Sequence, residues 1–416
     1  MALGEADGRS PPVEPSQNTA CARPLAEYPR ARVYLPPESA ATGRHAKAKI
    51  RSAEGRRVPP DDPAPTLQPG TAYCTEQAAR RYQGIASAGG WPILAKPAGT
   101  ISAPGELEEL RQRLLRGGDL EEDATGVGQD DALIGALKRF QFRAGIEQSG
   151  VLDETTRNAL NVPAGMRARE LEASANRIGS IKSPSAARYV VVNIPAASVE
   201  GVENSRAVQR HAAIAGKPSH PSPQLSATIQ SITINPSWTV PSSIVENELI
   251  PKLRRDPGYL RRAGLVIIGP RGREASIRHL RPSSARTFTI RQRPGAKNAL
   301  GRLRIDMPNS KEVYLHDTPA KRLFAENYRF LSHGCVRVDG IDDLAVWLLA
   351  GTPGHWDRRA IAAVVRTGRT KRIKLARPVP VAWVYLDAWE STDGTVHFAP
   401  DVYHLDSAAA GAALGP

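Results

Sequence analysis

The residues best suited to take part in a chemical reaction lie in the segment Ser332–Arg337, which has the sequence SHGCVR. A cysteine becomes a strong nucleophile only as a thiolate, so it needs a neighbouring base to take its proton. Gly334 allows a sharp backbone turn just before the sulfur of Cys335. We therefore expect the backbone amides of Gly334 and Cys335 to face the oxygen of a carbonyl under attack.

Two histidines are candidates for the base. His333 is two residues from Cys335, and His316 lies a short distance earlier in the sequence YLHDTP. A lone cysteine or histidine is more often structural than catalytic, so the prediction depends on the combination. From the residues alone, His333 is close enough, and His316, at the end of an expected strand, can reach across to the sulfur.

A histidine followed at this spacing by Ser-His-Gly-Cys resembles the catalytic motif of the L,D-transpeptidases, the YkuD-type enzymes of the bacterial cell wall. Longer phrases are similar to the YcbB-like branch of that family. They start at Val191 (VVNIPA), Ile234 (INPSWTVPSSIV), Arg291 (RQRPGAKNALGRLRIDMPN) and Val313 (VYLHDTPAKRLF). With the tail DGTVHFAPDVY, the resemblance covers about residues 187 to 405.

The resemblance assigns the nucleophile to Cys335 and the base to His316, whose ring is oriented by the backbone carbonyl of Asp317. The carboxylate of Asp317 is more simply explained as a cap of the turn before Pro319. His333 and Ser332 are expected to support the site, and the amide of Gly334 to serve as an oxyanion donor. The planar guanidinium of Arg337 is expected either to bind a substrate carboxylate or to form a structural ion pair.

The implied substrates are peptidoglycan stem peptides. Cys335 attacks a tetrapeptide donor, releases the terminal D-alanine and forms a thioester, which the side-chain amine of a neighbouring stem resolves as a 3-3 cross-link. Water as the acceptor gives an L,D-carboxypeptidase instead. The other hypotheses are a peptidase for ordinary L-peptides and a non-catalytic wall-binding protein. The motif indicates no metal and no cofactor.

The composition limits the partners. The chain has 416 residues and a formal net charge of +14. No basic segment interleaved with aromatic residues indicates nucleic-acid binding. The charge fits attraction to an anionic wall polymer, or an ordinary solvated basic surface. No transmembrane segment is expected. The resemblance implies the periplasm or cell envelope, although Met1 to Arg30 shows no export signal.

The remaining two cysteines, Cys21 and Cys74, are too few for a disulfide framework. They can pair in an oxidising compartment, but their surrounding sequence predicts little structure, so the question of a disulfide stays open.

The patterning predicts a multidomain α+β protein. Residues 1–70 are rich in Pro, Ala, Ser, Arg and Gly and predict a disordered or linker segment. Residues 71–162 predict a helical domain, with helices around Leu107 to Leu114, from Asp130 to Arg143, and from a cap at Asp153 to Leu160. The phrase LKRFQFRAGIEQSGVLDETTRNALN resembles a peptidoglycan-binding type 1 domain, a three-helix bundle, and a plain helical spacer is the alternative. Residues 163–186 predict a connecting helix.

From residue 187 short β-branched runs replace the helical periodicity, which predicts a β-rich catalytic domain over 187–376. The resemblance implies a β-sandwich with a lid insertion at about 241–286. A helix from Asp339 to Leu349 is expected to brace the catalytic loop. Residues 377–407 predict a hairpin extension of the catalytic domain, and residues 408–416 a tail.

Overall fold

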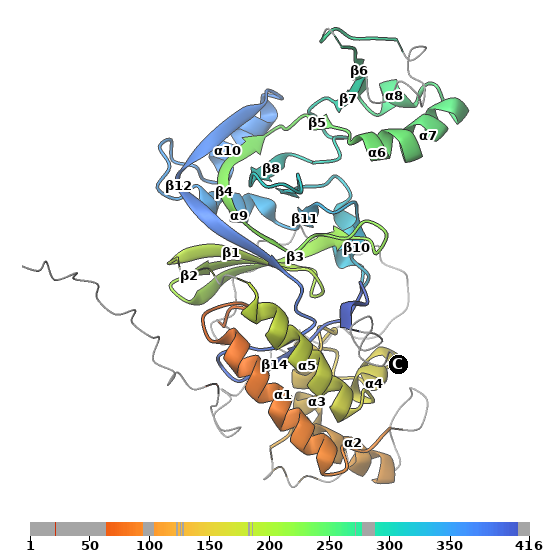
Figure 1. Cartoon of the computed structure of the whole chain (residues 1–416), viewed down its shortest axis with the longest axis vertical. Helices are drawn as coiled ribbons and strands as arrows, with labels where there is room; N and C mark the ends of the chain where they lie inside the picture. The colour runs from red at the N-terminus through yellow and green to blue at the C-terminus, as the bar shows by residue number, and fades with distance from the viewer. Residues whose placement is uncertain are drawn as a thin grey trace, which may run out of the picture.

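The computed structural model of the chain describes residues 21, 64–94, 104–121, 124, 126, 129–181, 184, 186–270, 272–276 and 288–406. Most of the expected linker, the 408–416 tail and part of the expected lid therefore lie outside the described residues. The described residues form three parts along the long axis (Figure 1): a helical region at one end, a central β-sheet and a smaller insertion at the other end.

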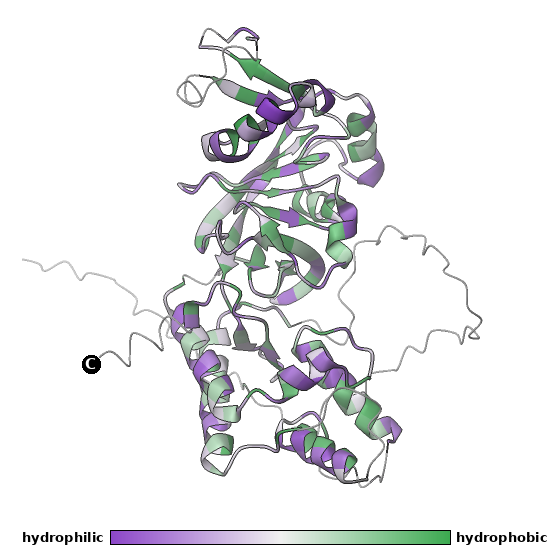
Figure 2. Ribbon diagram, turned by 90° about the vertical axis from the view of Figure 1, so that its right-hand side faces the viewer, coloured by the Kyte–Doolittle hydropathy of each residue, from purple (hydrophilic) through white to green (hydrophobic). Residues whose placement is uncertain are grey.

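The helical region contains five helices among its described residues: α1 (Thr71–Ser87), α2 (Pro104–Arg116), α3 (Asp131–Arg143), α4 (Glu154–Leu160) and α5 (Ala164–Gly179). The side chain of Asp130 caps α3 by accepting from the Leu133 amide, and that of Asp153 caps α4 by accepting from the Thr156 amide. Figure 2 shows hydrophilic and hydrophobic residues alternating along these helices. Helices α2, α3 and α4 share one cluster of buried leucines with Phe140.

The C-terminal hairpin packs on these helices. Its strands, β13 (Ala388–Glu390) and β14 (Val396–Phe398), pair with each other alone among the described strands. Tyr82 of α1 contacts both Trp91 and Phe398 edge to face. Ala388, Val396 and Phe398 belong to the same buried cluster as residues of α1 and α5. The hairpin therefore lies against the helical region, although the sequence groups it with the catalytic domain.

The central part is one nine-stranded sheet in the order β10-β3-β11-β9-β8-β4-β12-β1-β2. Because β2 also pairs with β3, the sheet closes on itself. The strands are β1 (Arg188–Asn193), β2 (Ser198–Glu203), β3 (Arg206–Gly216), β4 (Leu225–Ile234), β8 (Leu303–Asp306), β9 (Leu315–His316), β10 (Phe330–Ser332), β11 (Val336–Val338) and β12 (Lys371–Val384).

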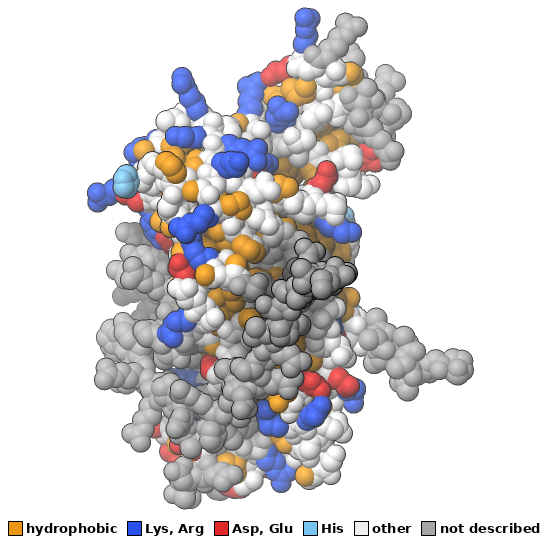
Figure 3. Space-filling view, turned by 60° about the vertical axis from the view of Figure 1, so that its left-hand side comes forward, with side chains coloured by type: hydrophobic (Ala, Val, Ile, Leu, Met, Phe, Trp, Pro, Cys, Tyr) orange, Lys and Arg blue, Asp and Glu red, His pale blue; other side chains and the backbone are white. Residues whose placement is uncertain are grey.

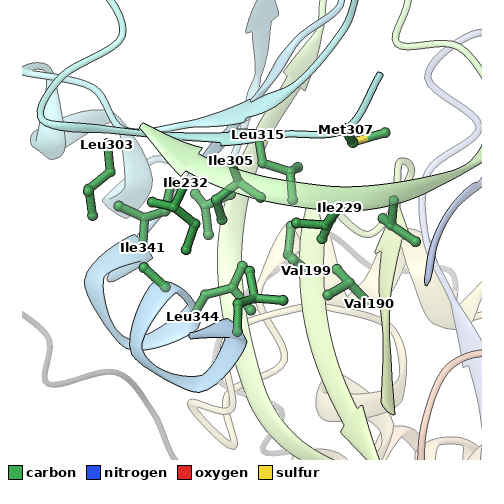
Figure 4. Packing of buried hydrophobic residues seen from close by; sticks show 14 of the residues in the cluster. Val190, Val199, Ile229, Ile232, Leu303, Ile305, Met307, Leu315, Ile341 and Leu344 are labelled. Carbon is green, nitrogen blue, oxygen red and sulfur yellow. The ribbon is translucent and has the colours of Figure 1, made fainter. Parts of the chain in front are cut away.

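The core of the sheet packs on helix α9 (Ile341–Leu348), assisted by α10 (Arg358–Arg366). Figure 4 shows Ile341 and Leu344 of α9 pointing toward Ile232, Leu303 and Ile305 of the strands. All five side chains are fully buried. Burial of one such side chain contributes about 1.5–3 kcal/mol, so α9 is a main support of the strands it contacts.

The segment from Ala64 to Gly70 departs from the linker prediction. Leu67 is fully buried. The amide and hydroxyl of Thr66 donate to the carboxylate of Glu200 on β2 at 2.9 Å each. The hydroxyl of Tyr189 donates to the Leu67 carbonyl at 2.8 Å. Residues 64–70 are therefore a strap across β1 and β2. The prediction failed here because the strap gains its partners from strands more than a hundred residues away.

A disulfide joins Cys21 to Cys74 of α1, a pairing that the sequence left open. Both residues are buried. The disulfide links Cys21 covalently to the helical region.

The insertion after β4 has its own small core. It contains α6 (Ser242–Ile244), the π-helix η2 (Val245–Leu249), α7 (Ile250–Arg255) and α8 (Tyr259–Arg262), with a three-stranded sheet of β5 (Trp238–Thr239), β7 (Thr289–Gln292) and β6 (Leu265–Ile268). Eight buried residues, among them Val245, Leu253 and Ile290, form this core. Between β9 and β10 lies a single 3-10 helix, η5 (Lys321–Ala325).

Replacing Leu344 with Ala tests the support that α9 gives to the sheet. We expect the free energy of unfolding to fall by about 2–5 kcal/mol, because the change leaves a cavity in the core. Val151→Ala, at a side chain that is 60% exposed, should change it by less than about 0.5 kcal/mol. Chemical denaturation followed by circular dichroism measures both, and equal effects of the two variants would contradict the assignment.

Candidate active site

Strand register brings the candidate residues to one face of the sheet. Arg337 on β11 lies opposite His316 on β9, and His316 lies opposite Arg304 on β8. The intervening residues Val336 and Leu315 are buried in the core with α9. Because successive side chains of a strand point to opposite faces, Arg304, His316 and Arg337 face away from that core.

Tyr314 and Cys335 share this face, since each lies two residues before one of these side chains. The Val336 amide donates to the Tyr314 carbonyl at 3.2 Å, which fixes the two segments side by side. The rings of Tyr314 and His316 meet edge to face with centroids 5.7 Å apart. Tyr314 also hydrogen-bonds Cys335 through both its main chain and its hydroxyl. The structure thus brings Cys335 and His316 to one site.

His316 is built as a neutral base. Its Nδ1 lies 2.5 Å from the backbone carbonyl of Asp317, so Nδ1 carries the proton and Nε2 is left as the acceptor. Burial, together with the positive charges of Arg337 and Arg304, lowers the pKa of His316 to about 3. The ring is therefore neutral at physiological pH and able to accept a proton.

The carboxylate of Asp317 does not serve as a third member of this pair. It accepts from the Arg302 amide at 2.8 Å and from the ammonium group of Lys321. These contacts hold the turn after β9, in line with the capping role expected from the sequence.

Cys335 is partly exposed and is the free cysteine of the described residues. Burial raises the pKa of its thiol, against the opposing effects of the Tyr314 hydrogen bonds and of Arg304 and Arg337. A protonated thiol beside a neutral imidazole is therefore the resting state. Such a pair can form a thiolate if the proton passes to the imidazole during attack on a carbonyl, as general-base catalysis requires.

Arg337 has an unusual environment for a guanidinium. Burial lowers its pKa, while the neighbouring Cys335 opposes that shift. Its Nε is buried without a hydrogen-bond partner, and among the described residues no carboxylate pairs with it. Arg304, by contrast, donates from Nε to Asp306 at 2.6 Å. The sequence left two alternatives for Arg337, a substrate carboxylate or a structural ion pair. Its described contacts do not include a structural ion pair.

The contacts of His333 do not support a role as the base for Cys335. Its Nε2 lies 2.5 Å from Oε1 of Glu248, in the π-helix of the insertion. Its ring also meets that of His220, with centroids 4.8 Å apart. His333 is therefore the contact between the catalytic loop and the insertion.

The two predicted oxyanion amides differ. The Gly334 amide donates to the hydroxyl of Ser332 at 3.2 Å, and that hydroxyl in turn donates to the Cys335 carbonyl. The Cys335 amide makes no recorded hydrogen bond to any described residue. It is the amide available to an incoming oxyanion, whereas the Gly334 amide is engaged within its own loop. The side chain of Ser332 thus hydrogen-bonds within the catalytic loop.

The sequence did not single out Tyr314, Arg304, Glu248 or His220. Tyr314 was detectable, because it lies two residues before His316 in an expected strand and so shares its face. The others carry no local signal, since only the sheet and the insertion place them near Cys335.

Cys335, directly before β11, and a neutral His316 on the adjacent strand β9, with its ring fixed by the next carbonyl, have the parts of an activated thiol nucleophile. Residues 187–355 match the family model described as YkuD, the L,D-transpeptidase catalytic domain. The matched residues lie within the range of the resemblance found in the sequence and include both His316 and Cys335.

A candidate L,D-transpeptidase from Haemophilus influenzae is 30% identical over 220 residues, which is 52% of this chain and 44% of that protein. The chain therefore spans less than half the length of this relative. Among solved structures, an L,D-transpeptidase from Mycobacterium smegmatis is 15% identical, with a TM-score of 0.25, over 50% of this chain and 64% of its own. One from Stackebrandtia nassauensis is 14% identical, with a TM-score of 0.27, over 70% and 96%.

The pH dependence of thiol alkylation tests the electrostatics of this site. We expect the rate of Cys335 alkylation by iodoacetamide to rise with pH to a midpoint above that of an unperturbed cysteine thiol, because burial raises the pKa of Cys335. No second inflection should occur near pH 6.5, because the pKa of His316 is about 3. Mass spectrometry of the labelled protein measures the rate, with Cys335→Ser as the unlabelled control. An inflection near pH 6.5 would show a preformed thiolate–imidazolium pair instead.

Proposed function

We propose that this protein is a peptidoglycan L,D-transpeptidase that forms 3-3 cross-links between stem peptides. The observation that carries the proposal is His316, neutral and with its tautomer fixed by the Asp317 carbonyl, on the same face as Cys335. This is the arrangement that general-base activation of a thiol needs.

In the first half-reaction Cys335 loses its proton to Nε2 of His316 as the sulfur attacks the carbonyl of the diamino acid in a tetrapeptide donor. The sulfur–carbon bond forms and the bond to the terminal D-alanine breaks. The proton on His316 then passes to the departing amine. The free amide of Cys335 stabilises the oxyanion of the tetrahedral intermediate.

In the second half-reaction the side-chain amine of a neighbouring stem attacks the thioester, and His316 accepts a proton from that amine. The new amide bond forms, the sulfur–carbon bond breaks, and the proton passes from His316 to the departing sulfur of Cys335. Water in place of this amine would give an L,D-carboxypeptidase. The insertion favours the transpeptidase, because its contact from Glu248 to His333 places it beside the catalytic loop, where it can order a peptide acceptor and exclude water. On this proposal the insertion is the lid.

Arg337 is proposed to bind a carboxylate of the stem. Arg337 is half-buried and its Nε is buried without a hydrogen-bond partner, which is costly, and a substrate carboxylate would satisfy the guanidinium through its planar fork. Its position opposite His316 in the register supports binding of that carboxylate close to the reacting carbonyl.

We propose further that the helical region is a peptidoglycan-binding unit and that the protein works in the periplasm or cell envelope. The Cys21–Cys74 disulfide supports an oxidising compartment. None of the helices that the structure describes combines the length and apolar character needed to cross a membrane. Lys and Arg side chains stand out over the upper part of the surface in Figure 3, which suits an anionic polymer.

Incubation with a disaccharide-tetrapeptide tests the activity. We expect release of D-alanine together with a dimer of stems, and loss of both in Cys335→Ala and His316→Ala, because nucleophile and base are then missing. Mass spectrometry identifies the products. D-alanine release without the dimer would support the carboxypeptidase, and binding to peptidoglycan without turnover would support a wall-binding protein. Activity that survives in Cys335→Ala would rule out the mechanism.

A paired substrate series tests Arg337. The wild type should prefer a stem with free carboxylates over one in which they are amidated, by about 10-fold or more in kcat/KM, since a hydrogen bond to a charged group is worth about 1.5–3 kcal/mol. Arg337→Met should lose most of this preference. The exposed Arg322→Met is the matched control and should retain it. An unchanged preference in Arg337→Met would show that Arg337 has no role in recognising the carboxylate.

A further inference from the structure

A closed ring of hydrogen bonds lies behind the catalytic loop. The amide of Gly216, the last residue of β3, donates to Oγ of Ser222 at 2.9 Å. The Ser222 amide donates to the hydroxyl of Tyr403 at 3.0 Å, and that hydroxyl donates to the Gly216 carbonyl at 2.7 Å. Ser222 is buried, so its rotamer is held by these partners.

One further hydrogen bond connects this ring to the catalytic loop. The hydroxyl of Ser222 donates to the Gly334 carbonyl at 2.8 Å. The peptide between Gly334 and Cys335 is planar and trans, so its carbonyl and its N–H point in opposite directions. A carbonyl fixed toward Ser222 therefore fixes the Cys335 amide away from Ser222. This amide is the one that no described residue engages.

Two glycines are required for this arrangement. Gly334 has φ +110°, a conformation that residues with a side chain rarely adopt. At Gly216 a Cβ would lie 2.3 Å from the His220 carbonyl oxygen and 2.6 Å from the Ser222 amide nitrogen. The segment from Lys217 to Ser222 thus folds back closely on β3. Its first amide, that of Lys217, donates to the Ser332 carbonyl at 3.0 Å, a second tie to the catalytic loop.

Tyr403 is itself held from the C-terminal side. Its amide donates to the hydroxyl of Tyr385 at 2.8 Å, and the two rings stack with centroids 5.3 Å apart. The Tyr385 hydroxyl donates to Asp401 at 2.6 Å. Arg177 of α5 binds the Tyr385 carbonyl at 3.0 Å and forms an ion pair with Asp406. The ring is therefore anchored to the helical region.

We propose that Ser222, held by Tyr403, is a positioning residue that orients the Gly334–Cys335 peptide so that the Cys335 amide faces the developing oxyanion. Neither residue touches the reacting atoms. The inference rests on the proposed function for its place in the stem reaction, but the geometry concerns any acyl transfer to Cys335.

Two chemical probes separate this role from a general structural one. p-Nitrophenyl acetate acylates Cys335 through a tetrahedral oxyanion and releases p-nitrophenolate. Iodoacetamide alkylates the same sulfur by displacement of iodide, which forms no oxyanion. We expect Ser222→Ala and Tyr403→Phe to slow acylation by about 10- to 100-fold, since loss of one oxyanion donor costs about 10²–10³-fold. Alkylation should change by less than about twofold.

The controls are Ser226→Ala and Tyr73→Phe, which make the same chemical changes at exposed positions and should alter neither rate. The double variant of Ser222 and Tyr403 should be no slower in acylation than Ser222→Ala, because both residues act through one peptide. Circular dichroism melting identifies a variant that fails to fold, and Ser222→Thr then replaces Ser222→Ala and should retain acylation.

Unchanged acylation in folded Ser222→Ala, or equal losses in both probe reactions, would overturn the proposal. These outcomes do not depend on the stem peptide. A wild type that reacts with both probes but releases no D-alanine would contradict the proposed function. The two probe reactions would still test whether Ser222 positions the Cys335 amide.

Discussion

The site depends on the pairing of three short strands against one helix. Strands β8, β9 and β11 are only two to four residues long, so they have little stability of their own. Their register is fixed because Leu303, Ile305, Leu315 and Val336 must face α9 and its surrounding core. A slip of one residue would turn Arg304, His316 and Arg337 toward that core and the apolar side chains away from it. Packing on α9 is thus what places His316 and Cys335 on the same face.

Desolvation sets the chemistry of that face. The same burial that lowers the pKa of His316 raises that of Cys335, so both groups are neutral before substrate arrives. Arg304 and Arg337 act in the opposite direction on Cys335, because their charges favour a thiolate. Charge separation is therefore disfavoured in the empty site, because the two arginines favour the thiolate but oppose the imidazolium that forms with it. A weakly reactive resting thiol is an advantage in an oxidising compartment, where a permanent thiolate would be oxidised readily.

The sequence predicted local features well and non-local ones poorly. The helices around Leu110, Phe140 and Leu160 followed from apolar periodicity and from the capping residues Asp130 and Asp153. Cys335 and His316 followed from motif spacing. The strap at residues 64–70 did not, because Pro-rich sequence gave no sign that Leu67 is buried under distant strands. Likewise the engagement of the Gly334 amide by Ser332, and of His333 by Glu248, depends on backbone geometry that no periodicity encodes.

The C-terminal segment shows why the helical region and the sheet are better treated as one mechanical unit than as two independent domains. Its hairpin shares a buried cluster with α1 and α5, and Tyr403 a few residues later hydrogen-bonds the end of β3. Arg177 on α5 binds residues on both sides of that hairpin. A shift of α5 relative to the sheet must therefore either break these charged contacts or move Tyr403, and with it the loop that holds Gly334. These contacts of Arg177, including its partly buried ion pair with Asp406, therefore connect the helices to the segment that holds the catalytic loop.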